Sequence, residues 1–100
     1  MKIDAELIAE LMPSLRAEIA RELVNFYKIT QTDASVMLGT TQPAVSQNVR
    51  QLRGKASFDS ETRKEISALC SRLVNGGIDK SALNNELYNI CRSAIEKRPK

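Results

Sequence analysis

Apolar residues recur three or four positions apart along most of the chain, a spacing that predicts amphipathic helices rather than strands. Leu7, Ile8 and Leu11 share one face of a first predicted helix, which begins near Asp4. We expect Pro13 to end this helix and to lie near the start of a second one, where its missing N–H costs nothing. The apolar stripe of the second helix consists of Leu15, Ile19, Leu23 and Phe26. The chain therefore opens with two predicted helices.

The C-terminal part of the chain predicts two longer helices, at about residues 60–75 and 80–97. Asp59 and Asp79 precede them as candidate N-caps, and Gly76-Gly77 supplies the left-handed conformation that ends a helix without strain. Their apolar positions at core spacing are Ile66, Leu69, Cys70 and Leu73 in the first helix and Leu83, Leu87, Ile90, Cys91 and Ala94 in the second. These two helices could complete the core or supply a dimerisation face.

Residues 31–53 predict two short helices joined by a tight turn. Ala34 and Leu38 form an i, i+4 pair that faces inward, and Gly39 supplies the positive φ of the turn. Thr41 is a candidate cap for the second short helix. The apolar stripe of that helix consists of Val45, Val49 and Leu52. We therefore predict a helix-turn-helix in this segment.

The opposite face of the second short helix is polar, and Pro43 suits its first turn. Amide side chains can pair bidentately with adenine in the major groove, and small side chains let a helix approach the bases. Backbone N–H groups at a helix start can also bind phosphate. We interpret this face as a candidate DNA-binding surface, the alternative being ordinary solvated amides. Its residues are Gln42, Ala44, Ser46, Gln47 and Arg50.

Composition and charge agree with one globular domain spanning residues 1–100, since 42% of the residues are apolar and 27% are charged. With the helical pattern, they predict an all-α fold, a compact bundle of about six helices. The net charge of +3 is uneven: residues 1–41 hold four Lys or Arg and six Asp or Glu, whereas residues 42–100 hold eleven and six. The positive half begins with the candidate DNA-binding helix, as expected if it faces phosphates. The alternative is a solvated surface with ordinary scatter of charge.

Other functions lack the residue types that they need. The chain has no histidine, which removes the commonest general base and zinc ligand, so we predict no enzyme, no metal and no cofactor. Four aromatic residues and no tryptophan are too few for a platform that stacks single-stranded nucleic acid. No run is apolar enough for a membrane span or a secretory leader, which predicts a cytoplasmic protein. Cys70 and Cys91 are predicted as buried reduced thiols, with a disulfide between their helices as the alternative.

The segment ITQTDASVMLGTTQPAVSQNVRQLRGK resembles the lambda-repressor-like (Xre-type) helix-turn-helix. The whole chain looks like a family of small archaeal transcriptional regulators, related to the N-terminal domain of archaeal thiamine-pathway regulators. The resemblance implies that Gln42 contacts a base and is braced by Gln31. The matching positions are Thr30, Gln31, Leu38, Gly39, Thr41, Gln42, Val45 and Ser46. It also implies that Ser46 and Gln47 face bases or backbone and that Arg50, Arg53 and Lys55 lie along phosphates.

These features predict a sequence-specific transcription regulator that binds double-stranded DNA, acts as a repressor and forms a homodimer. Two recognition helices one DNA turn apart improve affinity and specificity. The alternative is a protein-interaction adaptor or antitoxin-like subunit that uses the same fold on another protein. No small-molecule ligand is evident from the sequence.

Overall fold

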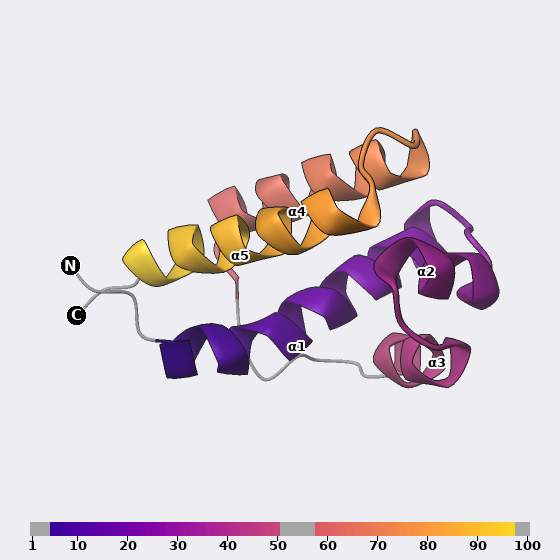
Figure 1. Ribbon diagram of the computed structural model, residues 1–100, viewed down its shortest axis with the longest axis horizontal. Helices are drawn as coiled ribbons and strands as arrows, with labels where there is room; N and C mark the ends of the chain where they lie inside the picture. The colour runs from indigo at the N-terminus through magenta and orange to yellow at the C-terminus, as the bar shows by residue number, and fades with distance from the viewer. Residues whose placement is uncertain (1–4, 51–57, 98–100) are drawn as a thin grey trace.

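The computed structural model describes residues 5–50 and 58–97, and every regular element in them is helical (Figure 1). The elements are α1 (Ala5–Arg21), a π-helical turn η1 (Glu22–Phe26), α2 (Gln31–Leu38), α3 (Gln42–Arg50), α4 (Ser60–Val74) and α5 (Lys80–Glu96). The radius of gyration is 13.0 Å and the principal extents are 39 × 28 × 22 Å. The prediction of a compact all-α fold is therefore confirmed, with five α-helices in the described part of the chain.

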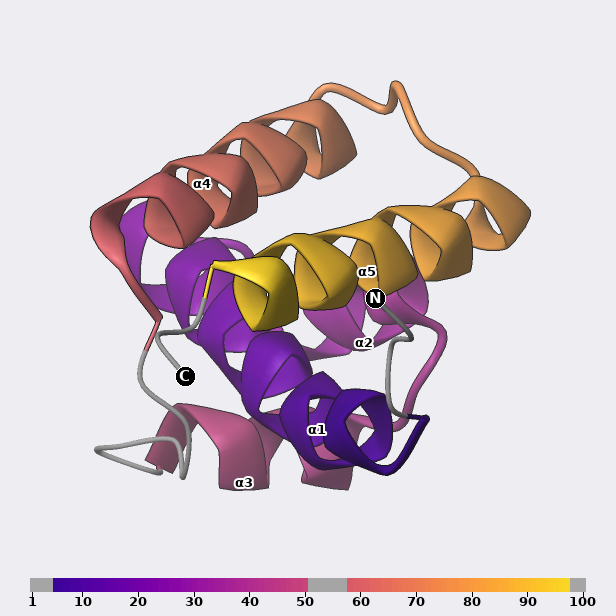
Figure 2. The same ribbon diagram turned by 90° about the vertical axis from the view of Figure 1, so that its left-hand side faces the viewer.

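Helix α1 lies at the centre of the arrangement. The antiparallel pair α4 and α5 covers one side of it and α3 crosses the other, as both ribbon views show (Figures 1 and 2). Helix α2 lies beside the C-terminal part of α1 and leads through a short turn into α3. Because α3 contacts the other described elements mainly through α1 and α2, its outer face is left open by the part of the chain that the structure describes.

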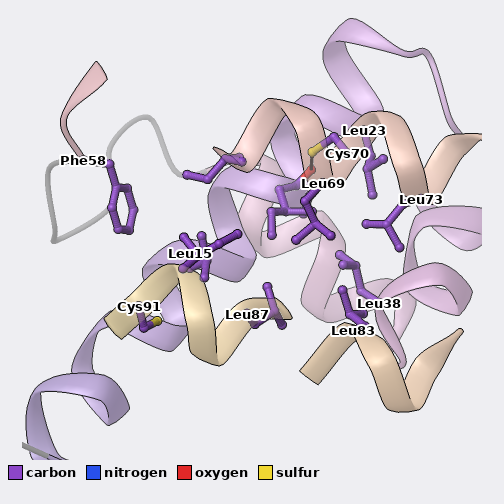
Figure 3. Packing of buried hydrophobic residues seen from close by; sticks show 14 of the residues in the cluster. Leu15, Leu23, Leu38, Phe58, Leu69, Cys70, Leu73, Leu83, Leu87 and Cys91 are labelled. Carbon is purple, nitrogen blue, oxygen red and sulfur yellow. Dashed lines mark hydrogen bonds between the residues drawn. The ribbon is translucent and has the colours of Figure 1, made fainter. Parts of the chain in front are cut away.

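Leucines from α1, α4 and α5 point toward one another and form the centre of the core (Figure 3). Leu15, Ile19 and Leu23 of the first helical segment are completely buried, as is Leu87 of α5. The stripes predicted for the last two helices are confirmed, with Ala94 half-buried at the edge. Among the described residues, no helix is both long and apolar enough to cross a bilayer.

Pro13 does not end a helix: it lies inside α1, so the prediction of two separate N-terminal helices is wrong. Proline cannot donate the bond that the carbonyl of Ala9 would accept in a helix interior. Both residues are exposed, so water can hydrate that carbonyl. Leu11 and Leu15 are buried on the other side of the same helix, before and after the proline. Their burial requires one continuous helix, and this outweighs the single lost hydrogen bond.

Phe26 was predicted to lie in the core, and this prediction is wrong because its side chain is 72% exposed. The cause is the π-helical turn, in which the N–H of Tyr27 donates to the carbonyl of Glu22 at 3.2 Å. A turn closed by i→i+5 bonds holds more residues than an α-helical turn, so positions three apart no longer share a face. Leu23 stays in the core, Phe26 turns outward, and the half-buried Tyr27 packs against the core.

Short side chains cap the helices as predicted. The carboxylate of Asp59 accepts from the N–H of Thr62 at 2.8 Å, and that of Asp79 accepts from Ala82 at the same distance. Each bond satisfies one of the donors that the first turn of a helix leaves unpaired. Gly76, with φ of 74°, lies just beyond α4 in the left-handed conformation. The turn between α4 and α5 is therefore encoded locally.

Replacing Pro13 by alanine should stabilise the protein. The substitution restores an N–H donor in mid-helix, where proline costs roughly 3 kcal/mol relative to alanine, while the unfolded chain regains about 1 kcal/mol of freedom. We expect a net gain of about 1–2 kcal/mol in the free energy of unfolding, measured by urea denaturation. A loss of stability would mean that the ring of Pro13 itself contributes to packing between α1 and α3.

The charge of Asp79 should make stability depend on pH at the acidic end. Bonds from the N–H of Ala82 and from the hydroxyl of Ser81 lower the pKa of this carboxyl below its ordinary value of 3.8. Its contribution is therefore complete above about pH 4 and is lost as the pH falls through the lower, folded-state value. Asp79→Asn keeps the acceptor but cannot titrate, so the Tm difference from wild type should shrink steadily below pH 4. A constant difference down to pH 2 would contradict this.

Candidate nucleic-acid interface

The start and end of α2 are set by local hydrogen bonds. The hydroxyl of Thr30 accepts from the N–H of Asp33 at 3.1 Å, which caps the first turn. Gly39 ends the helix with φ of 66°, a conformation that glycine adopts without strain. The N–H of Thr40 then donates to the carbonyl of Ser35 at 2.9 Å. The chain therefore turns within a few residues before α3 begins, as predicted.

Helix α3 begins immediately after this turn. The hydroxyl of Thr41 accepts from the N–H of Ala44 at 3.2 Å, which confirms the predicted cap. Pro43 lies in the first turn, where its missing N–H has no helical partner to lose. Val45 is completely buried and Val49 half-buried, so this side holds α3 against the fold. Leu52, predicted to continue the stripe, lies outside the described residues.

A side-chain hydrogen bond joins the first residues of the two helices. The Nε2 of Gln42 donates to the Oε1 of Gln31 at 2.6 Å, across eleven residues of sequence. The resemblance predicted this contact, and the bond is present. It restricts the side chain of Gln42, which is exposed at the beginning of α3. An amide has two N–H donors and one carbonyl acceptor, so Gln42 keeps one donor and its acceptor free for another molecule.

The other predicted site residues that the structure describes gather on α3 or next to it. Thr41, Pro43, Gln47 and Arg50 are exposed, and Ser46 is half-buried. Ala44 is also half-buried, and with Asn48 it lines a groove of about 340 Å³ between α3 and α1. The outer face of α3 is thus polar and open, whereas Ala44 lies at its border with α1. Arg53 and Lys55 lie outside the described residues.

Among the described residues, most of the positive charge of the C-terminal half lies away from this face. Most described cations from α4 to Lys97, the residue after α5, form ion pairs with carboxylates of α1, α4 or α5, which supports the alternative of scattered surface charge for this part of the chain. The pairs are Arg63 with Glu18, Arg72 with Glu86, Arg92 with Glu96, and Lys97 with Glu61 and Glu65. Arg50, by contrast, forms no ion pair with a described residue and lies on the open face of α3.

Arg16 is a residue next to this site that the sequence pattern did not single out. Its guanidinium donates through Nη1 to the carbonyl of Leu38 at 3.3 Å and through Nη2 to Oδ1 of Asn84 at 3.1 Å. The partners lie 22 and 68 positions away in the sequence. No local signal could have revealed them, because periodicity and capping patterns extend over only a few residues.

Neither cysteine offers a reactive group. Cys70 and Cys91 are buried and free, as predicted, so they form no disulfide. Burial is the main reason that the pKa of Cys70 rises to about 12, and the nearby Glu22 carboxylate adds to it. Burial also raises the pKa of Cys91. Both thiols therefore stay protonated at neutral pH. Within the described residues, no three side chains that could bind a metal ion lie together.

Comparison of the chain with models of protein families, with curated proteins and with solved structures found no match in any of the three. The case for a function therefore depends on the contacts of this chain itself. The most specific of them is the Gln31–Gln42 pair at the open start of α3.

Proposed function

We propose that this chain is a sequence-specific regulator of transcription that binds double-stranded DNA, with α2 and α3 as a helix-turn-helix. The single observation that carries the proposal is the hydrogen bond from Gln42 to Gln31. A long polar side chain on a surface normally loses conformational freedom when it binds, and this cost reduces affinity. The hydrogen bond to Gln31 already restricts the side chain of Gln42 in the free protein, so Gln42 loses less conformational entropy when it binds.

The donors and acceptors of Gln42 match one base. Adenine presents the N7 acceptor and the N6 donor in the major groove, and a glutamine amide can pair with both. One N–H of Gln42 is used by Gln31, which leaves one donor for N7 and the carbonyl oxygen for N6. The braced side chain therefore retains the groups that this pairing requires.

The rest of α3 supports such docking. Gln47 and Arg50 are exposed further along the helix, where they would face bases and phosphates. The half-buried Ser46 is small enough to let the helix enter the groove. We propose repression as the mode of regulation, because a small protein on an operator blocks access without needing another contact.

We further propose that the protein binds as a homodimer through α5. Tyr88 is 45% exposed on the outer side of this helix, among otherwise polar neighbours. An aromatic side chain at the centre of a polar rim is typical of a protein interface. Two copies would present two α3 helices to two half-sites of one operator.

A protein-interaction adaptor is the second candidate, and one observation favours it. Phe26 is 72% exposed beside an open groove of about 560 Å³, which Arg21, Glu22 and Ser67 also line. An exposed phenylalanine is a common anchor for a partner protein. This groove lies on residues of α1, η1 and α4, away from α3, so the two candidates involve different surfaces.

Gln42→Ala should relax the preference for one base pair. In binding to duplexes selected from a random pool, we expect a loss of about 1–3 kcal/mol of discrimination at that position. The slope of log affinity against log salt should stay unchanged, because no phosphate contact is removed. Gln31→Ala should affect the same base position, and the double variant should lose less than the sum of the two.

Asn75→Ala is the matched amide control, since Asn75 is exposed just beyond the end of α4, outside both α3 and the proposed dimer face on α5. It should leave affinity, discrimination and salt slope unchanged. Arg50→Ala should reduce the salt slope by about 1 without changing base preference. Duplex binding that is undetectable or insensitive to salt would reject the proposal and favour the adaptor.

Tyr88→Glu should convert the protein to a monomer, because it places a charge where the dimer would bury an aromatic ring. Sedimentation at micromolar concentration should give twice the chain mass for the wild type and the single chain mass for the variant. Phe26→Ser, which removes a more exposed ring from a different surface, is the control and should remain dimeric. A monomeric wild type that does not pair on DNA would exclude the dimer.

A further inference from the structure

Arg16 links three helices through contacts that the proposed function does not use. Its half-buried side chain starts on α1, and its guanidinium bonds to the last carbonyl of α2 and to Asn84 on α5. The last four carbonyls of a helix lack a donor within the helix. Arg16 supplies one to Leu38, and its positive charge also interacts favourably with the negative end of the α2 dipole.

An apolar contact supports the polar one. Leu38 and Leu83 lie next to each other in Figure 3, and both are buried. Together with Gly39, Asn84 and Arg16 itself they line one small hollow of about 230 Å³. The end of α2 is therefore attached to α5 by a leucine pair in the interior and by the arginine at the surface.

The contacts of Arg16 with Leu38 and Asn84, together with the Leu38–Leu83 contact, form a joint between α2 and α5. The position of this joint is important for the proposed DNA-binding face. Leu38 immediately precedes Gly39, the residue at which the chain turns toward α3. On its other side, Arg16 also lines the groove between α1 and α3, with Thr40 and Ala44. One side chain thus borders both ends of the turn, and it is bonded to one of them.

We propose that Arg16 is a positioning residue: through Leu38 and Asn84 it holds the α2–α3 turn at the angle to α5 that DNA binding requires. This inference rests on the proposed function, but its structural part can be measured without DNA. The amides of Gly39 and Thr40 are suitable reporters, since they donate to Val36 and Ser35 at 3.2 and 2.9 Å. A looser turn would expose them to exchange with solvent.

The test is Asn84→Ala, which removes the α5 side of the joint and leaves the net charge unchanged. Asn84 is exposed, so the fold should survive and the Tm should stay close to that of the wild type. Amide exchange at Gly39 and Thr40 should accelerate about three- to tenfold, and affinity for the duplex that the wild type selects from a random pool should fall by a similar factor. Asn84→Asp keeps the acceptor and should preserve slow exchange.

Asn85→Ala, one residue along the same helix, is the matched control for exchange and should leave the exchange rates of Gly39 and Thr40 within twofold of the wild type. If Asn84→Ala and Asn85→Ala behave alike in exchange, the inference is overturned whether or not the protein binds DNA. If exchange accelerates but affinity for a selected duplex is unchanged, the role in DNA binding is overturned. If the wild type selects no duplex, the proposed function falls together with this role.

Discussion

Burial of α1 is the constraint on which the rest of the structure depends. Leu15 and Ile19 of α1 and Leu23 of the π-helical turn that continues it are completely removed from solvent. The α4–α5 pair covers one side and α3 the other (Figure 2). Each buried side chain of this size contributes about 1.5–3 kcal/mol. The hydrophobic effect therefore selects an arrangement in which α1 is central and α3 keeps one face open.

Apolar burial alone leaves helices free to slide, and polar contacts along the border of α1 limit this freedom. Glu18 pairs with Arg21 in the same helix and with Arg63 of α4, and Arg16 bonds to the end of α2 and to α5. Surface pairs of this kind add little stability. Their geometry is specific, however, so they define the angles between elements that the core holds together. Asn84, the α5 partner of Arg16, lies one helical turn before the exposed Tyr88.

The features that the sequence determined by itself are those encoded within four or five residues. Asp59 and Asp79 each cap the helix that follows them, because a carboxylate at the N-cap meets a free N–H three positions later. Gly39 ends α2 for an equally local reason. The same range covers the inward pair Ala34 and Leu38. The Gln31–Gln42 bond spans eleven residues, beyond the range of a local signal, and only the resemblance to the lambda-repressor-like helix-turn-helix led us to expect it.

Tertiary structure decided the remainder. Pro13 carries the local signal for a helix end, but burial on both sides of it favours one continuous helix, and the lost bond falls on the wet face. Phe26 carries the spacing of a core residue, but closure of the π-helical turn rotates it outward. The partners of Arg16 come from helices that meet only when the chain is folded. In each case the outcome is a balance between a local preference and the burial of distant surface, and a sequence pattern contains only the first of these.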